Sequence, residues 1–133
     1  MSGDKLIFTN GCFDILHCGH IKLLEYAKSL GSKLIVGINS DRSIRSIKGP
    51  ARPVNPEGDR KYILESVKYV DKVIIFDEET PLRLISDINP DIIVKGGDYK
   101  IAEVVGHKLA EVKIFDYLNE YSTTKIIESL TTG

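Results

Sequence analysis

Uninterrupted runs of hydrophobic residues recur along the chain and alternate with segments in which hydrophobic residues follow a helical period. Each run is short and rich in β-branched residues. None shows the alternation of hydrophobic and polar residues that is typical of a strand with one solvent-exposed face. This pattern is typical of strands that are buried on both faces of a parallel sheet. We therefore predict strands at 5–9, 33–39, 72–76, 91–95 and 112–115.

The segments between these runs predict helices. In the first of them, Ile21, Leu24 and Ala27 lie three residues apart, Leu23 and Leu30 extend the same face, and Gly31 follows as a stop signal. The later segments begin with polar or proline residues that favour helix starts. The predicted helices are 18–30, 41–47, 57–69, 80–88 and 122–130.

Strands and helices alternate five times, which predicts an α/β fold with a doubly wound, parallel, five-stranded sheet and helices on both faces. Ligands of such sheets bind outside the carboxyl ends of the strands, near the point where the strand order reverses. The loops that follow the first, second, fourth and fifth strands are therefore the places to look for function.

Composition narrows the class of protein. The chain has 133 residues, 42% of them hydrophobic, and a net charge of −1, so we expect one domain over 1–133 and no broad basic surface for nucleic acid or an anionic membrane. No apolar run approaches the roughly 20 residues that span a bilayer. Residues 1–5 lack a signal-peptide pattern, so we expect a cytoplasmic protein in which Cys12 and Cys18 are free thiols.

The loop after the first strand carries two glycines and two histidines. Gly11 is expected to let the backbone turn tightly, and Gly19 to let a ligand approach the start of the next helix. A helix N-terminus presents free N–H groups that suit a phosphate. His17 and His20 are three residues apart, so both side chains can reach such a phosphate and stabilise charge on its oxygens.

Two other interpretations of this loop are open. A histidine near a helix start is often structural, although two histidines beside two glycines favour a site. Cys12, His17, Cys18 and His20 are also possible metal ligands, but Cys18 and His20 point about 200° apart on a helix. The loop lacks the glycine patterns of dinucleotide-binding and P-loop proteins, which disfavours a hydride-transfer enzyme.

The same residues resemble a known family. Gly11-Cys-Phe-Asp-Ile-Leu-His-Cys-Gly-His20 is similar to the G-x-F-D-x-x-H-x-G-H motif of the cytidylyltransferase-like nucleotidyltransferases. The resemblance implies a Rossmann-like fold and two histidines that contact the triphosphate and stabilise the transition state. It assigns nucleotide binding in this loop to Asn10, Gly11, Cys12, Phe13 and Gly19.

A cluster of basic residues follows the second strand. Arg42, Arg45, Lys48, Arg52 and Arg60 lie within 19 residues and can bind the phosphates of two anionic reactants. The K-G-P-x-R-P-V-N-P pattern of 48–56 resembles the adenylyltransferase domain of bifunctional heptose-phosphate kinase/adenylyltransferases. The resemblance gives Lys48 a catalytic role beside His17 and His20, whereas Arg60 is alternatively a structural ion-pair partner. The predicted acceptor-binding residues are Asp14, Arg45, Arg52 and Lys95.

Two later segments resemble the same group. Val94-Lys-Gly-Gly-Asp-Tyr99 matches a motif near the nucleotide and contributes Gly97 and Asp98, and the hydroxyls of Ser122, Thr123 and Thr124 match a helix start that binds the triphosphate tail. The segment 105–114 is shorter than is usual in that group. No arginine shortly precedes Ser122, which favours the heptose-type branch over glycerol-phosphate cytidylyltransferases.

We therefore expect an enzyme that transfers AMP from ATP to a sugar phosphate of the D-glycero-D-manno-heptose 1-phosphate type, with release of pyrophosphate. A phosphate monoester is largely a dianion at pH 7, so it needs no protein base to attack the α-phosphorus. Mg²⁺ is expected to accompany ATP, and the resemblance implies a homodimer. The alternatives are a glycerol-3-phosphate-type cytidylyltransferase, an FMN adenylyltransferase and a nucleotide-binding regulator without turnover.

Overall fold

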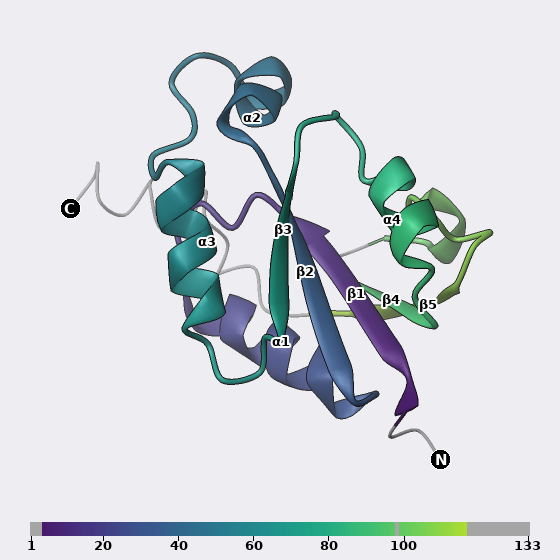
Figure 1. Ribbon diagram of the computed structural model, residues 1–133. Helices are drawn as coiled ribbons and strands as arrows, with labels where there is room; N and C mark the ends of the chain where they lie inside the picture. The colour runs from purple at the N-terminus through teal and green to yellow at the C-terminus, as the bar shows by residue number, and fades with distance from the viewer. Residues whose placement is uncertain (1–3, 98, 117–133) are drawn as a thin grey trace.

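The computed structural model describes residues 4–97 and 99–116, which form one parallel five-stranded sheet with the order β3-β2-β1-β4-β5 (Figure 1). From β1 the chain builds outward through β2 to β3 and then crosses to the other side of β1, where β4 and β5 lie. The strand order therefore reverses between β1 and β4. The strands are β1 (Leu6–Gly11), β2 (Lys33–Asn39), β3 (Lys72–Phe76), β4 (Ile92–Gly96) and β5 (Glu111–Phe115).

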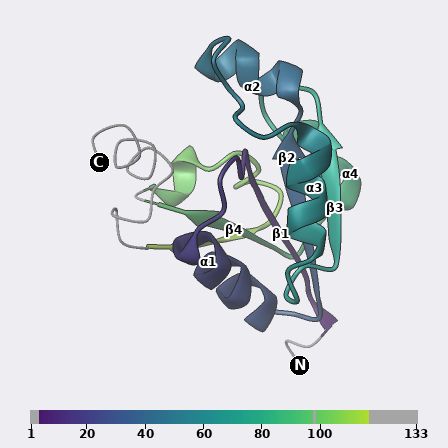
Figure 2. The same cartoon turned by 90° about the vertical axis from the view of Figure 1, so that its left-hand side faces the viewer.

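Helices cover both faces of this sheet, as predicted. α1 and α3 lie on one face and α4 lies on the other, while α2 stands beyond the carboxyl end of β2 (Figures 1 and 2). None of the helices in the described ranges is long and apolar enough to cross a bilayer. The helices are α1 (Cys18–Ser29), α2 (Asp41–Lys48), α3 (Glu57–Glu65) and α4 (Leu82–Ile88), with a 3₁₀ turn, η2, at Ile101–Glu103.

The core has two halves, one on each face of the sheet. In β1, Ile7 packs with Leu24 of α1 and Leu64 of α3, whereas the next residue, Phe8, packs with Ile85 of α4. All five side chains are fully buried, and they divide between the two halves because successive residues of a strand point to opposite faces. Burial on both faces explains why the strands read as unbroken apolar runs.

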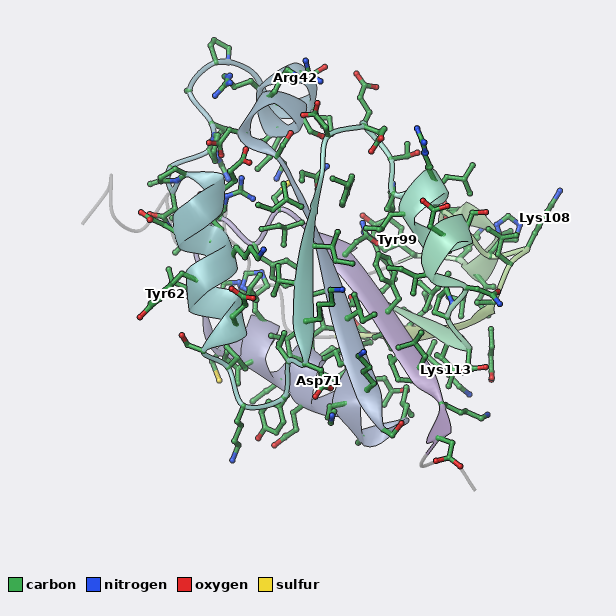
Figure 3. The ribbon with its side chains drawn as sticks, viewed as in Figure 1. Arg42, Tyr62, Asp71, Tyr99, Lys108 and Lys113 are labelled. Carbon is green, nitrogen blue, oxygen red and sulfur yellow. The ribbon has the colours of Figure 1, made fainter. Side chains whose placement is uncertain are left out.

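Two aspartates close the amino end of the sheet. Asp71 accepts hydrogen bonds from the backbone N–H of Leu34 and from Lys28 Nζ, and Asp91 accepts one from the backbone N–H of Leu6. Asp71 lies at the opposite end of the sheet from Arg42 of α2 (Figure 3). These carboxylates satisfy backbone donors at strand starts, far from the loops that carry the predicted site.

The turn after β1 differs from the prediction. Asn10 and Gly11 continue the strand and pair with Gly37 and Ile38, so Gly11 does not make the tight turn. The left-handed conformation in this loop falls instead on Phe13, which has a φ of 48°. A Cβ on Gly11 would lie 3.1 Å from the Phe13 ring, so this glycine provides room for the ring rather than a turn.

The third helix is shorter than predicted. α3 ends at Glu65 instead of Tyr69, and the chain continues in tight turns to β3. The Ser66 hydroxyl donates to the carbonyl of Tyr62, and the Ser66 N–H is shared among several carbonyls of the last turn. Such local bonds compete with helix propagation. The predicted helix 122–130 lies outside the described residues.

Candidate active site

A cavity of about 210 Å³ opens at the carboxyl ends of β1 and β4, where the strand order reverses. This is the position at which ligands of doubly wound sheets bind. It brings together residues from the loop after β1, the loop after α2 and the end of β4. Within 4–97 and 99–116, nine predicted site residues line it: Asn10, Gly11, Cys12, Phe13, Asp14, His20, Lys48, Arg52 and Lys95.

The two histidines form a close, tilted pair of rings at the start of α1. His17 is the N-cap, in extended conformation rather than on the helix, and its Nδ1 accepts the backbone N–H of Gly19 at 3.1 Å. His20 Nδ1 accepts the backbone N–H of His17 at 3.2 Å. The ring centroids are 3.8 Å apart. The two imidazoles thus make a capping box of the kind that Ser or Thr makes with Glu or Gln.

This capping box fixes where each ring carries its proton. A backbone N–H can only donate, so each Nδ1 is an acceptor and the proton of each neutral ring is on Nε2. Burial lowers the pKa of His17, and burial followed by repulsion from His17 lowers the pKa of His20 to about 4. At pH 7 both rings are therefore neutral, with the proton on Nε2.

The low pKa of His20 predicts a pH dependence of stability. In the unfolded chain histidine titrates near pH 6.5, so between pH 6.5 and 4 the unfolded state binds a proton that the folded state does not. The free energy of unfolding should therefore fall by about 2 kcal/mol between pH 7 and pH 4.5 on account of this group. Urea unfolding of the wild type and of His20→Gln at both pH values measures it, and an equal pH dependence of the two proteins would contradict it.

In the part of the chain that the structure describes, three cations face the cavity: Lys48 at the end of α2, Arg52 in the loop that follows, and Lys95 in β4. Burial lowers the pKa of Lys95, with a smaller lowering from the nearby Lys48, while Cys12 opposes the shift. Lys95 Nζ also lies 5.2 Å from the centroid of the Tyr99 ring. Two ammonium groups that repel each other across a cavity are stabilised by an anion placed between them.

The carboxylate of Asp14 is buried and fully engaged. It accepts the backbone N–H groups of Val54 and Asn55, at 2.9 and 2.8 Å, and Arg52 Nε at 3.2 Å. The Asn55 side chain in turn donates to the backbone carbonyl of Asp14 at 2.6 Å. Asp14 therefore joins the loop after β1 to the loop between α2 and α3.

Arg60 of α3 lies behind the cavity and is 1% exposed. Its guanidinium donates to the carbonyls of Cys12, Asn39 and Asn55 and to the carboxylate of Asp41, all at 2.8–2.9 Å. Of the two interpretations that the sequence left open for Arg60, the structural one is confirmed.

Several predicted residues lie elsewhere. Arg45 is exposed on α2, and neither it, His17, Gly19 nor Gly97 is among the described residues that line the cavity. Asp98, Ser122, Thr123 and Thr124 lie outside the described residues. Three residues that the sequence did not single out also line the cavity: Leu23, Gly96 and Tyr99. Tyr99 is the last residue of the 94–99 motif, two residues after Gly97. Its place in that motif could have identified it as a site residue.

The described residues do not support the metal interpretation of this loop. In 4–97 and 99–116 no three His, Cys, Asp or Glu side chains gather where they could hold a metal ion. Cys18 is exposed, and Cys12 Sγ lies 3.8 Å from the side-chain oxygen of Asn39.

Comparisons with known proteins agree with this geometry. The cytidylyltransferase-like family matches residues 8–129. The chain is 55% identical to the bifunctional protein HldE of a Nitratiruptor species and 56% identical to that of Campylobacter jejuni, over 96% and 95% of its length. It spans about 28% of the length of these relatives.

Solved structures give the same answer. The lipopolysaccharide core biosynthesis protein of Thermoplasma volcanium superimposes with a TM-score of 0.71, is 30% identical, and covers 87% of this chain and 98% of its own. Pantothenate synthetase of Thermus thermophilus, at 18% identity and a TM-score of 0.60 over 86% of this chain and 56% of its own, shares the fold. The chain therefore belongs to the cytidylyltransferase-like family. The predicted Rossmann-like fold and nucleotidyltransferase class are confirmed.

Proposed function

We propose that this chain transfers AMP from ATP to the phosphate of a sugar phosphate of the heptose 1-phosphate type and releases pyrophosphate. The observation that carries the proposal is one cavity at the strand-order reversal: among the described residues, His20 and three cations line it, and the ring of His17 lies against that of His20. The HldE relatives and the lipopolysaccharide core biosynthesis protein support it, as does the resemblance of 48–56 to heptose-phosphate adenylyltransferases.

Charge stabilisation is the main contribution of the site in this mechanism. As the acceptor oxygen attacks the α-phosphorus in line, charge develops on the other α-phosphoryl oxygens and on the departing pyrophosphate. The Nε2–H groups of His17 and His20 donate to the α-phosphoryl oxygens. The capping box holds the His20 ring at the cavity wall, whereas His17, whose Nε2 is buried, has to shift to reach the phosphate. Lys48, Arg52 and Lys95 offset the charges that two anionic reactants bring into one cavity.

The proposal needs no general base. The attacking phosphate is already a dianion at neutral pH. Asp14 is the carboxylate among the described lining residues, and the backbone and Arg52 occupy both of its oxygens. Transfer therefore relies on position and electrostatics rather than on proton abstraction.

Mg²⁺ enters the proposal as a companion of the triphosphate. It favours open carboxylate, phosphate and water oxygens, and the engaged carboxylate of Asp14 is a poor ligand for it. When bound it would neutralise phosphate charge, held by the phosphates and water, and the side chain of Asn10, which lines the cavity, is a candidate protein ligand. The roles proposed for His17, His20, Lys48, Arg52 and Lys95 do not depend on the metal ion.

The proposal predicts a specific substrate pair. Pyrophosphate release should require both ATP and the sugar phosphate, and CTP, glycerol 3-phosphate or FMN should give rates lower by at least about tenfold, or 1.4 kcal/mol. The assay crosses ATP and CTP with D-glycero-D-manno-heptose 1-phosphate, glycerol 3-phosphate and FMN. His17→Asn is the matched inactive control. Preference for CTP or for another acceptor would reassign the substrate, and nucleotide binding without pyrophosphate release would indicate a regulator.

A further inference from the structure

We propose that Asp14 is a positioning residue for the acceptor side of the site: it holds Arg52 and the loop between α2 and α3 in the orientation that receives the acceptor phosphate. The inference rests on the proposed function and departs from the sequence-based prediction that Asp14 itself binds the acceptor. A buried carboxylate in this place would repel a phosphate, whereas it attracts the groups that bind one.

The loop depends on Asp14 because packing does not fix it. The side chain of Val54 is 57% exposed, so apolar burial contributes little to holding this part of the chain. Its backbone N–H and that of Asn55 instead donate to the two Asp14 oxygens, and the Asn55 side chain returns a bond to the Asp14 carbonyl. Hydrogen bonds to a charged acceptor are stronger than neutral ones, so Asp14 contributes strongly to the order of this loop, beside the bond from Arg60 to the Asn55 carbonyl.

The contact with Arg52 also orients a cation. Asp14 takes the Nε–H of Arg52, and Arg52 lines the cavity. A guanidinium held through Nε keeps its two terminal nitrogens for a second partner, and their planar geometry matches a phosphate. Asp14 also lies three residues before His17, so the loop that presents the imidazoles and the loop that presents Arg52 are tied together at one carboxylate.

The test compares two aspartates with similar partners. Asp14→Asn replaces an acceptor by an amide whose Nδ2 faces the N–H groups of Val54 and Asn55. Asp71→Asn makes the same change in a carboxylate that accepts hydrogen bonds from the Leu34 N–H and from Lys28. Asp71 lies at the amino end of the sheet, away from the site (Figure 3). In the steady-state assay with ATP and the sugar phosphate, Asp14→Asn should raise KM for the sugar phosphate about 10- to 100-fold and leave KM for ATP within about twofold. Asp71→Asn should lower the urea midpoint but leave both KM values unchanged.

Two further readouts separate this role from general destabilisation. Amide exchange of Val54 and Asn55, followed by NMR on the chain without substrate, should be slow in the wild type and in Asp71→Asn and fast in Asp14→Asn. The effects of Asp14→Asn and Arg52→Ala on acceptor KM should also be non-additive, because both remove the same oriented guanidinium.

Three results would overturn the inference: an unchanged acceptor KM in Asp14→Asn, an equal rise in Asp71→Asn, or fast exchange of both amides in the wild type. If Asp14→Asn does not fold, Arg52→Lys decides, since it keeps the charge but loses the planar fork. It should raise acceptor KM and keep both amides protected, and an unchanged acceptor KM contradicts the inference. A wild type that turns over no sugar phosphate would defeat the proposed function, while amide exchange would still decide whether Asp14 orders the loop.

Discussion

His17→Asn and His20→Gln are each expected to lower turnover by roughly 10²–10³ while the fold stays intact, the usual effect of losing one donor to a developing oxyanion. The geometry of the turn suggests these substitutions instead of alanine. His17 is an N-cap and His20 is at the third helical position, and each accepts a backbone N–H through Nδ1. Asn is a good N-cap and Gln a good partner at that third position, so the pair of variants keeps the capping bonds and removes only the imidazole Nε2–H.

Turnover is measured as pyrophosphate release at saturating ATP and sugar phosphate, with urea unfolding as the check on the fold. His17→Ala is the comparison variant, because it loses both the donor and the cap and should cost about 1 kcal/mol of stability in addition. Cys12→Ser serves as the control within the same loop and should stay active, since the mechanism uses no protein nucleophile. Near-normal turnover in both His17→Asn and His20→Gln would refute the assigned role of the imidazoles.

The parts of the site that could be predicted from the sequence are those encoded locally. The strand before the loop is an unbroken apolar run because both faces of β1 are covered, as Ile7 and Phe8 show. His17 and His20 are three residues apart on either side of a helix start, so their proximity follows from the spacing alone. The same holds for the place of the cavity, because the alternation of strands and helices fixes which ends of the strands carry the loops.

The contacts between distant segments that assemble the site could not be predicted from the sequence. Asp14 bonds to Val54 and Asn55, about 40 residues away, and Arg60 bonds to the carbonyl of Cys12, 48 residues away. No periodicity relates such partners, and a carboxylate or a guanidinium in a motif is as compatible with ligand binding as with a buried bond. This ambiguity applies to both residues: burial and four acceptors resolve it for Arg60, and the Asp14→Asn variant tests it for Asp14.

Arg60→Met is expected to lower the free energy of unfolding by about 3–5 kcal/mol, the largest stability effect that the structure predicts. Among the described residues Arg60 is the largest fully buried side chain, and its removal leaves four acceptors without their donor: the carbonyls of Cys12, Asn39 and Asn55 and the carboxylate of Asp41. Methionine fills much of the volume of the arginine side chain, so the loss of stability reflects mainly the missing hydrogen bonds. Arg60→Lys should recover only part of the stability, because a single ammonium does not reach three segments with the geometry of a guanidinium.

The matched control is Arg42→Met, on the neighbouring α2. Arg42 pairs with Asp77 through an exposed contact, and its side chain is 77% exposed, so its loss should cost less than about 1 kcal/mol. Urea unfolding at pH 7 compares the two variants. Because Arg60 fixes the backbone at Cys12, at the end of β2 and in the loop that carries Arg52, its loss should also weaken binding of both substrates, in contrast to the selective effect of Asp14→Asn. A stability loss for Arg60→Met no greater than that for Arg42→Met would show that the guanidinium does not hold these three segments together.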